Sequence, residues 1–400
     1  MSLLSKKEGK MKKIIMLMVT VVLLIPILLG TNNSWAAETV LNHVIPIPGF
    51  IDFSTTPPTV AFDISWVDSN KYYLTDPGTS STTGSGRIDI FDAIDDIYLG
   101  SITGFYGNHN PPGSHDFSGP NGVLVLHNHG KNELWTGDGD STVKVVDLDK
   151  MAIVATIPTG TLPADGKADE LAYDSKHHII LISNPLATTP FVTFISQETR
   201  KVLGKIDLPE VIIGGVNNGI EQPVFDPKTN LFYLSLPATV SNPGGEIAVI
   251  DPVAMKIIKH FPVTDCNPNG LALGPNSHLL LGCGSAKTII MDENGGIVAT
   301  ITEVGGSDQV WFNPGDNRYY LAAFLNPSGP VLGVIDAKTN TWIENVPTIF
   351  PSHSVAVNPT NNHIFVPVVL SGVIGEDNFG IAVYEHELEK LEKDRDRSPR

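Results

Sequence analysis

Two stretches of this chain, SDQVWFNPGDNRYYLAA at Ser307–Ala323 and IEQPVFDPKTNLFYLSL at Ile220–Leu236, align without a gap. Each has a carboxylate near its start, a short apolar run, a turn at Asn-Pro or Asp-Pro, and an aromatic run at its end. Apolar runs of this length on both sides of such a turn are typical of two paired β-strands. The recurrence predicts a chain built from copies of one strand-turn-strand unit.

The unit recurs along the chain, with copies starting at Phe62, Asn121, Asp169, Glu221, Asn269, Asp308 and His353. A second strand pair follows each of the first six copies. Its turn begins with Asp92, Asp147, Ser196, Asp251, Asp292 and Asp336 in order along the chain. Asp or Ser at the first position of a tight turn accepts hydrogen bonds from the turn's own backbone. These turn residues are therefore expected to be structural.

The seventh copy ends at Gly380–His386 and lacks a fourth strand. The segment Val40–Pro48, VLNHVIPIP, is similar to the fourth strand KVLGKIDLP at Lys201–Pro209 and predicts the missing strand. A ring closed in this way leaves no sheet edge free to pair with other chains. We therefore expect residues 37–386 to form an all-β, seven-bladed β-propeller of four-stranded blades, closed by the N-terminal strand. A linear solenoid is the alternative, but it would not need that strand.

The two ends of the chain are expected to lie outside the propeller. Residues 1–36 combine lysines, an apolar run at Ile14–Leu29 and the small residues Ser34 and Ala36, which is the pattern of a signal peptide. The start at Met1 or Met11 stays open, and so does an uncleaved membrane anchor, although the run is short for a span. Cleavage would give a periplasmic or secreted protein. Residues 387–400 form a charged tail to which we assign no function.

The composition limits the partners. The 400 residues carry a formal net charge of −17 and 42% hydrophobic residues, which is ample for a core. A chain this acidic is not expected to bind nucleic acid, nor to bind a membrane after the signal peptide is cleaved. We expect the protein to be a monomer. The cysteines, Cys266 and Cys283, predict one disulfide in an exported protein. Two free buried thiols are the alternative.

A polar residue starts the first strand of every copy. The residues are Asp63, Asn121, Asp169, Glu221, Asn269, Asp308 and His353, here called the mouth column. The innermost strand of each propeller blade lines the central channel, so the mouth column should surround one channel mouth. Crowded carboxylates repel each other, and a divalent cation such as Ca²⁺, which prefers oxygen ligands, would relieve the repulsion. A water-filled, merely polar mouth is the alternative.

The histidines differ in what their positions predict. His353 belongs to the mouth column and is the candidate for proton transfer near neutral pH. His109 and His115 lie in a long loop expected above the mouth and are further candidates for that site. Turn positions on the opposite face are predicted for the remaining pairs, His127 with His129 and His177 with His178.

The blade sequence TVKVVDLDKMAIVATIPTG at 142–160 resembles the YVTN-repeat, or YncE-like, propellers. The stretch NPNGLALGPNSHLLLGC at 267–283 is similar to the SMP-30/gluconolactonase and paraoxonase-like propellers. The second resemblance implies a divalent metal held by Glu221, Asn269, Asp308 and Asn121 and hydrolysis of lactones or esters, with His353 or Asp169 activating water. The order of these residues around the ring, the seven blades and the extra carboxylates differ from that family's pattern.

Two functions are consistent with the sequence. One is a metal-dependent hydrolase of the lactonase or esterase kind, and the other is a non-catalytic propeller that binds a small ligand or a protein through its loop face. The chain has no GxSxG nucleophile elbow, phosphate-binding loop or dinucleotide fingerprint. These absences count against other enzyme classes and do not decide between the two.

Overall fold

The computed structural model describes residues 39–48, 62–78, 80–110, 117–128, 130–214, 217–349, 351–369 and 379–387. The predicted signal peptide, residues 1–36, and residues 388–400 of the predicted tail lie outside this part of the chain. Within the described residues, no helix is long and apolar enough to cross a membrane.

Seven four-stranded antiparallel sheets make up the fold. From the inner to the outer strand, they are β2(Ser65–Asp68), β3(Lys71–Asp76), β4(Gly86–Asp92), β5(Ile97–Phe105); β8(Val123–Asn128), β9(Lys131–Asp138), β10(Thr142–Asp147), β11(Ala152–Pro158); β12(Leu171–Asp174), β13(Ile179–Asn184), β14(Phe191–Ser196), β15(Val202–Asp207); β18(Pro223–Asp226), β19(Leu231–Leu236), β20(Glu246–Asp251), β21(Lys256–Pro262); β22(Pro268–Leu273), β23(Leu279–Cys283), β24(Thr288–Met291), β25(Ile297–Ile301); β26(Val310–Asn313), β27(Arg318–Ala323), β28(Val331–Asp336), β29(Thr341–Pro347); and β30(Ala356–Val357), β31(Ile364–Val369), β32(Phe379–His386), β1(Thr39–Pro46). We number these sheets as blades 1 to 7 in that order.

The remaining elements are short. Two ribbons, β6(Gly107–Asn108) with β7(Ser118–Gly119) and β16(Ile213–Gly214) with β17(Asn217–Asn218), lie in connections between blades. One 3₁₀ turn, Pro275–Ser277, joins β22 to β23.

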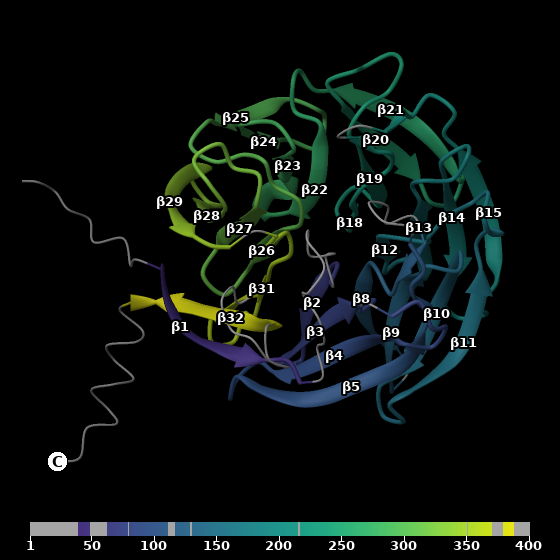
Figure 1. Ribbon diagram of the computed structural model, residues 1–400. Coiled ribbons are helices and arrows are strands. Elements are labelled where there is room, and N and C mark those ends of the chain that lie inside the picture. The colour runs from purple at the N-terminus through teal and green to yellow at the C-terminus, as the bar shows by residue number, and fades with distance from the viewer. Residues whose placement is uncertain are drawn as a thin grey trace, which may run out of the picture. The chain divides into compact units, whose positions relative to one another are not determined.

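The blades form a closed ring. Each innermost strand contacts the innermost strand of the next blade, and β30 of blade 7 contacts β2 of blade 1. Figure 1 shows the seven sheets arranged around a common centre. The chain is therefore a seven-bladed β-propeller, as the repeat predicts.

The N-terminal strand closes the ring as expected. Strand β1 pairs antiparallel with β32, from Thr39 opposite His386 to Pro46 opposite Gly380. Blade 7 therefore takes its outer strand from the start of the described chain and its other strands from the end. The predicted closure is confirmed, and a linear solenoid is excluded.

The predicted turn residues act as caps. Oδ1 of Asp147 accepts hydrogen bonds from Asp149 N at 3.1 Å and Lys150 N at 3.0 Å. The equivalent aspartates of the other blades make the same kind of contact, and Ser196 Oγ accepts one from Thr199 N at 3.2 Å. The sequence interpretation of these residues is confirmed.

Apolar side chains from neighbouring blades form the core. Strand β13 is buried along its whole length, whereas the outer strand β15 is made of exposed and half-buried residues. Each packed cluster draws on adjacent blades, as where Tyr72 of blade 1 stacks on Phe365 of blade 7 with ring centroids 5.0 Å apart. Apolar packing between neighbouring sheets therefore stabilises the ring. The polar residues of the channel are not part of these apolar clusters.

Candidate functional site

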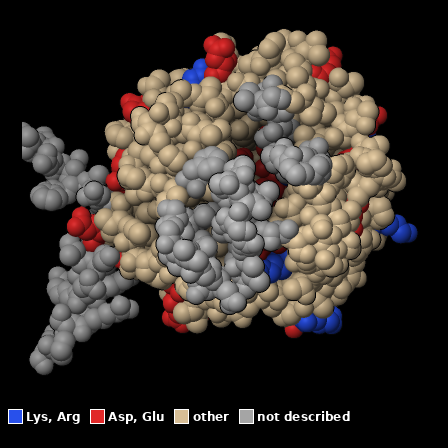
Figure 2. Space-filling model, viewed as in Figure 1, with Lys and Arg blue, Asp and Glu red and all other residues tan. Residues whose placement is uncertain are grey.

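The mouth column lies where the inner strands begin. The backbone N–H of a column residue donates to a carbonyl on the second strand of its own blade, for example Asp169 N to Ser183 O at 2.9 Å and Asp308 N to Ala322 O at 3.1 Å. Asp63, Asn121 and Glu221 make the same bond at 3.0 Å each. These five residues therefore occupy equivalent positions in their blades. Figure 2 shows Asp and Glu atoms at the centre of the ring.

The acidic members of the column act on each other. Burial raises the pKa of Glu221 well above its usual range, and the charges of Asp308, Asp169 and Asp63 raise it further. Burial likewise raises the pKa of Asp169 to about 6, although Lys167 opposes the shift. Mutual effects of this size require carboxylates close together in a poorly solvated place. The carboxylates of the column therefore influence one another electrostatically.

A lysine that the sequence interpretation did not single out lies among these carboxylates. Lys167 Nζ is 3.0 Å from Asp169 Oδ2 and 3.4 Å from Asp63 Oδ2, and its side chain is 10% exposed. Burial lowers its pKa, but the charges of Asp169 and Asp63 outweigh that effect and the net pKa is raised. The site therefore contains its own ammonium ion, which offsets part of the negative charge.

Glu170 is a second residue that the sequence interpretation missed. It follows Asp169, is 6% exposed, and has a pKa that burial and the neighbouring carboxylates raise well above its usual range. Within the described part of the chain, no hydrogen bond reaches the carboxylates of Glu170 or of Glu221, which is 8% exposed. Among the described residues, the mouth thus has five carboxylates, those of Asp63, Asp169, Glu170, Glu221 and Asp308, and one lysine.

His353 pairs with an acid of the column. Its Nδ1 lies 3.2 Å from Asp308 Oδ2, and its ring stacks on Phe62 with centroids 4.8 Å apart. Burial lowers the pKa of His353, but the nearby carboxylate of Asp308 reverses the effect and the net pKa is raised. An imidazole held between a carboxylate and an aromatic ring has a fixed orientation, which proton transfer requires.

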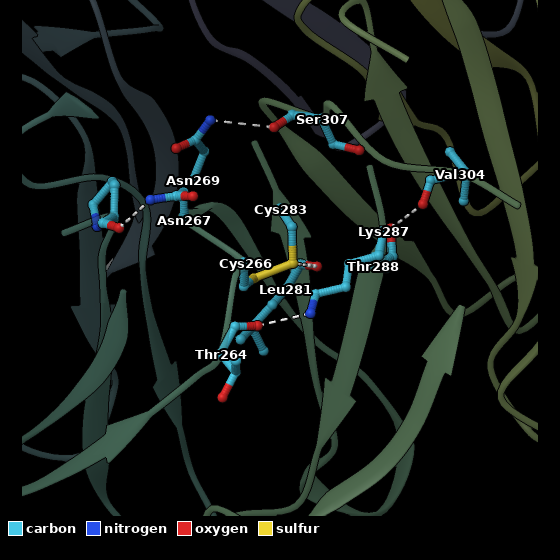
Figure 3. The surroundings of a disulfide bond; sticks show 11 residues. Thr264, Cys266, Asn267, Asn269, Leu281, Cys283, Lys287, Thr288, Val304 and Ser307 are labelled. Atoms are coloured by element: carbon cyan, nitrogen blue, oxygen red, sulfur yellow. Dashed lines mark hydrogen bonds between the residues drawn. A yellow bond between two sulfur atoms is a disulfide. The ribbon is translucent and has the colours of Figure 1, made fainter. Parts of the chain in front are cut away.

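The two amide residues of the column contact backbone. Asn121 is fully buried, and its Nδ2 donates to Ser118 O at 2.8 Å and Ala168 O at 3.0 Å. Its Oδ1 has no hydrogen-bond partner within the described residues. Asn269 Nδ2 donates to Ser307 O at 3.3 Å, as Figure 3 shows. Among the described residues the Asn121 oxygen is therefore unpaired but shielded from solvent, and a ligand could reach it only after a local rearrangement.

The donor chemistry suits a hard cation, because Glu221, Asp308, Asn269 and Asn121 all offer oxygen atoms. In the described ranges, however, no three Asp, Glu, His or Cys side chains are close enough to hold a metal ion. A metal ion would therefore have to draw the carboxylates of the mouth together.

The other histidines have contacts of their own. His109 stacks on Tyr106 at 4.0 Å between centroids, and its Nε2 lies 3.0 Å from Tyr106 O. His115 and His129 lie outside the described residues. His127 Nε2 lies 2.6 Å from Asp68 Oδ2, and His177 Nδ1 lies 2.7 Å from Asp174 Oδ2. His177 lies in the turn between β12 and β13, as predicted, whereas His127 lies at the end of strand β8 instead of in the turn that follows it.

Cys266 and Cys283 are at disulfide distance, with Cα atoms 4.7 Å apart. Figure 3 shows the pair beside Asn269 and Ser307. Ser307 N donates to Cys283 O at 3.0 Å, which connects blade 5 to the start of blade 6. The cysteine pair therefore braces the part of blade 5 that carries its mouth residue.

No protein-family model and no curated protein matches this sequence. The structure matches 1537 chains of solved structures. One is a chain of the crystal structure of a mitotic checkpoint complex, with a TM-score of 0.59 and 11% identity over 88% of this chain and 94% of that chain. Identity this low shows the fold alone. Fold and site together define a seven-bladed β-propeller with an acidic channel mouth.

Proposed function

We propose that this chain is an exported β-propeller that binds a cation at its channel mouth, with Ca²⁺ as the first candidate. The observation that carries the proposal is the excess of carboxylates over positive charge among the described residues of the mouth. Glu170 and Glu221 make no hydrogen bond with the described residues, and a carboxylate that is largely removed from water and crowded by like charges is costly to ionise. A cation among them would offset that cost.

Calorimetric titration of the purified protein with CaCl₂ tests the proposal. Glu221→Gln and Asp308→Asn should each weaken binding at least tenfold, because each removes one charged oxygen donor. Glu198→Gln and Asp207→Asn are matched controls, since both acids are exposed and away from the mouth column. Undiminished binding in the two mouth variants, or no binding by the wild type, would contradict the proposal.

Hydrolysis of a lactone or ester is a second candidate, because His353 is paired with Asp308 at the mouth. In that reaction His353 accepts a proton from water, and Asp308 orients the ring and stabilises the imidazolium. A bound divalent ion would polarise the carbonyl. The resemblance to SMP-30/gluconolactonase-like propellers supports this candidate. Turnover of a lactone and ester panel should be lost with chelator and in His353→Gln. Turnover unchanged by both would exclude the role.

Export is part of the proposal and is supported by the signal-peptide pattern and by the cysteine pair at disulfide distance. Mass spectrometry of the mature protein should place its first residue after Ala36. Retention of the full N-terminus would contradict export with cleavage. The other candidate is a non-catalytic propeller that binds a protein partner on its loop face. A structural similarity at 11% identity does not identify such a partner.

A further inference from the structure

Lys167 enters the mouth from blade 3 and reaches the acid of blade 1. Its ammonium lies between Asp169 of its own blade and Asp63. Blade 2, which lies between these two blades, contributes the neutral Asn121, whose amide group is bound to backbone. The lysine side chain therefore extends across one sector of the acidic mouth.

The backbone that carries Lys167 is fixed from both sides. Its carbonyl accepts a hydrogen bond from Asn184 Nδ2 at 3.1 Å. The next residue, Ala168, donates to Asp138 O at 3.0 Å and accepts from Asn121 Nδ2 at 3.0 Å. The ammonium itself contacts only the two carboxylates among the described residues. A flexible side chain on a fixed backbone can move its charged end without disturbing the fold.

We infer that Lys167 is an internal counter-ion of the mouth, which a bound cation must displace from Asp63 and Asp169. A divalent ion among the same carboxylates would repel the ammonium, so the two compete for the same negative charge. Lys167 thereby sets the affinity of the site and keeps the mouth partly neutralised when no ligand is bound. The inference rests on the proposed function, since it assumes that a cation binds there.

Repeat comparison supports a role specific to this blade. The position two residues before the column residue is, in blades 1 to 7, Ala61, Gly119, Lys167, Gly219, Asn267, Gly306 and Pro351, so Lys167 is the one charged residue in the set. The turn itself thus needs no long side chain. A lysine at this position is explained by what its ammonium contacts.

Calcium titration of Lys167→Met and Lys167→Arg against the wild type tests the inference. Lys167→Met should bind Ca²⁺ at least tenfold more tightly, because the competing charge is gone, whereas Lys167→Arg should remain near the wild type. Without Ca²⁺, Lys167→Met should melt at a lower temperature than the wild type, and added Ca²⁺ should close the gap. The double variant Lys167→Met with Asp63→Asn keeps the net charge of the mouth and serves if the single variant does not fold. It should bind Ca²⁺ more tightly than Asp63→Asn alone.

The outcomes separate the two proposals. Equal affinity in the wild type and Lys167→Met, or weaker binding in Lys167→Met, would overturn the displacement of Lys167 and leave calcium binding standing. Absence of binding in every variant would overturn the proposed function and this inference together.

Discussion

Replacement of Asp169 by asparagine should change how the stability of the propeller depends on pH. Asp169 has a pKa of about 6 in the folded chain, against an ordinary 3.8, and burial is the largest cause. Between these values the folded protein keeps a proton that the unfolded chain has lost. The stabilisation is therefore fully present below about pH 4 and is lost as pH rises through 6.

The magnitude follows from the two pKa values. The difference between about 6 and 3.8 corresponds to about 3 kcal/mol of unfolding free energy, lost by the wild type between about pH 4 and about pH 7.5. Lys167, Asp63, Asp308, Glu170 and Glu221 face this carboxylate, and the two glutamates shift in the same direction and steepen the loss. The amide that replaces the carboxyl group in Asp169→Asn does not ionise. The variant should match the wild type at about pH 4 and exceed it by about 3 kcal/mol at about pH 7.5.

Urea denaturation at a series of pH values, followed by tryptophan fluorescence, measures the effect. Asp207→Asn is the control, because Asp207 is exposed on the outer strand β15 and should leave the wild-type pH dependence unchanged. A stability difference between Asp169→Asn and the wild type that stays constant across this pH range would refute the reasoning.

Three further predictions concern the ring itself. Gln309→Ala should lower the free energy of unfolding by about 2 to 3 kcal/mol, because three hydrogen bonds are lost. Gln309 Nε2 donates to Ser65 O at 2.8 Å, and its Oε1 accepts from Ser354 Oγ at 2.5 Å and Val355 N at 3.1 Å. Unchanged stability in urea would contradict this prediction. Reduction of the Cys266–Cys283 pair, 17 residues apart, should cost about 3 kcal/mol in urea unfolding with dithiothreitol, and an unaltered midpoint would count against a bond in solution. A chain lacking β1 exposes the edge of β32 and should elute as oligomers in size-exclusion chromatography, whereas a stable monomer would show that closure is dispensable.

The repeat makes the fold predictable from the sequence, and particular residues show why. Asp147 and its equivalents cap their own turns, so a local pattern fixes a local structure. The strand at Thr39–Pro46 is predictable because its sequence is similar to the fourth strand of blade 3. The column residues Asp169, Glu221 and Asp308 are predictable because their place in the unit fixes their place at the mouth.

Residues that act across blades are not predictable in the same way. Lys167 stands before its strand, and only its reach from blade 3 to Asp63 of blade 1 shows what it does. Gln309 of blade 6 joins Ser65 of blade 1 and Ser354 of blade 7, which are distant in the chain. Such contacts depend on the curvature of the closed ring, and the repeat period carries no information about them. Lys167 is the one charged residue at its repeat position, and this is the signal that the sequence offers.

Deviation from the repeat is therefore where function is to be sought in this molecule. Positions that match from blade to blade meet requirements that those blades share, such as the turn cap of blades 1 to 6 or the first hydrogen bond of the inner strand. A ring of identical blades would present the same group from every side and could not orient an asymmetric ligand. Lys167 and Glu170 place a cation and an extra acid at blade 3, and His353 places an imidazole at blade 7. The mouth thereby acquires the asymmetry that selective binding of one ligand requires.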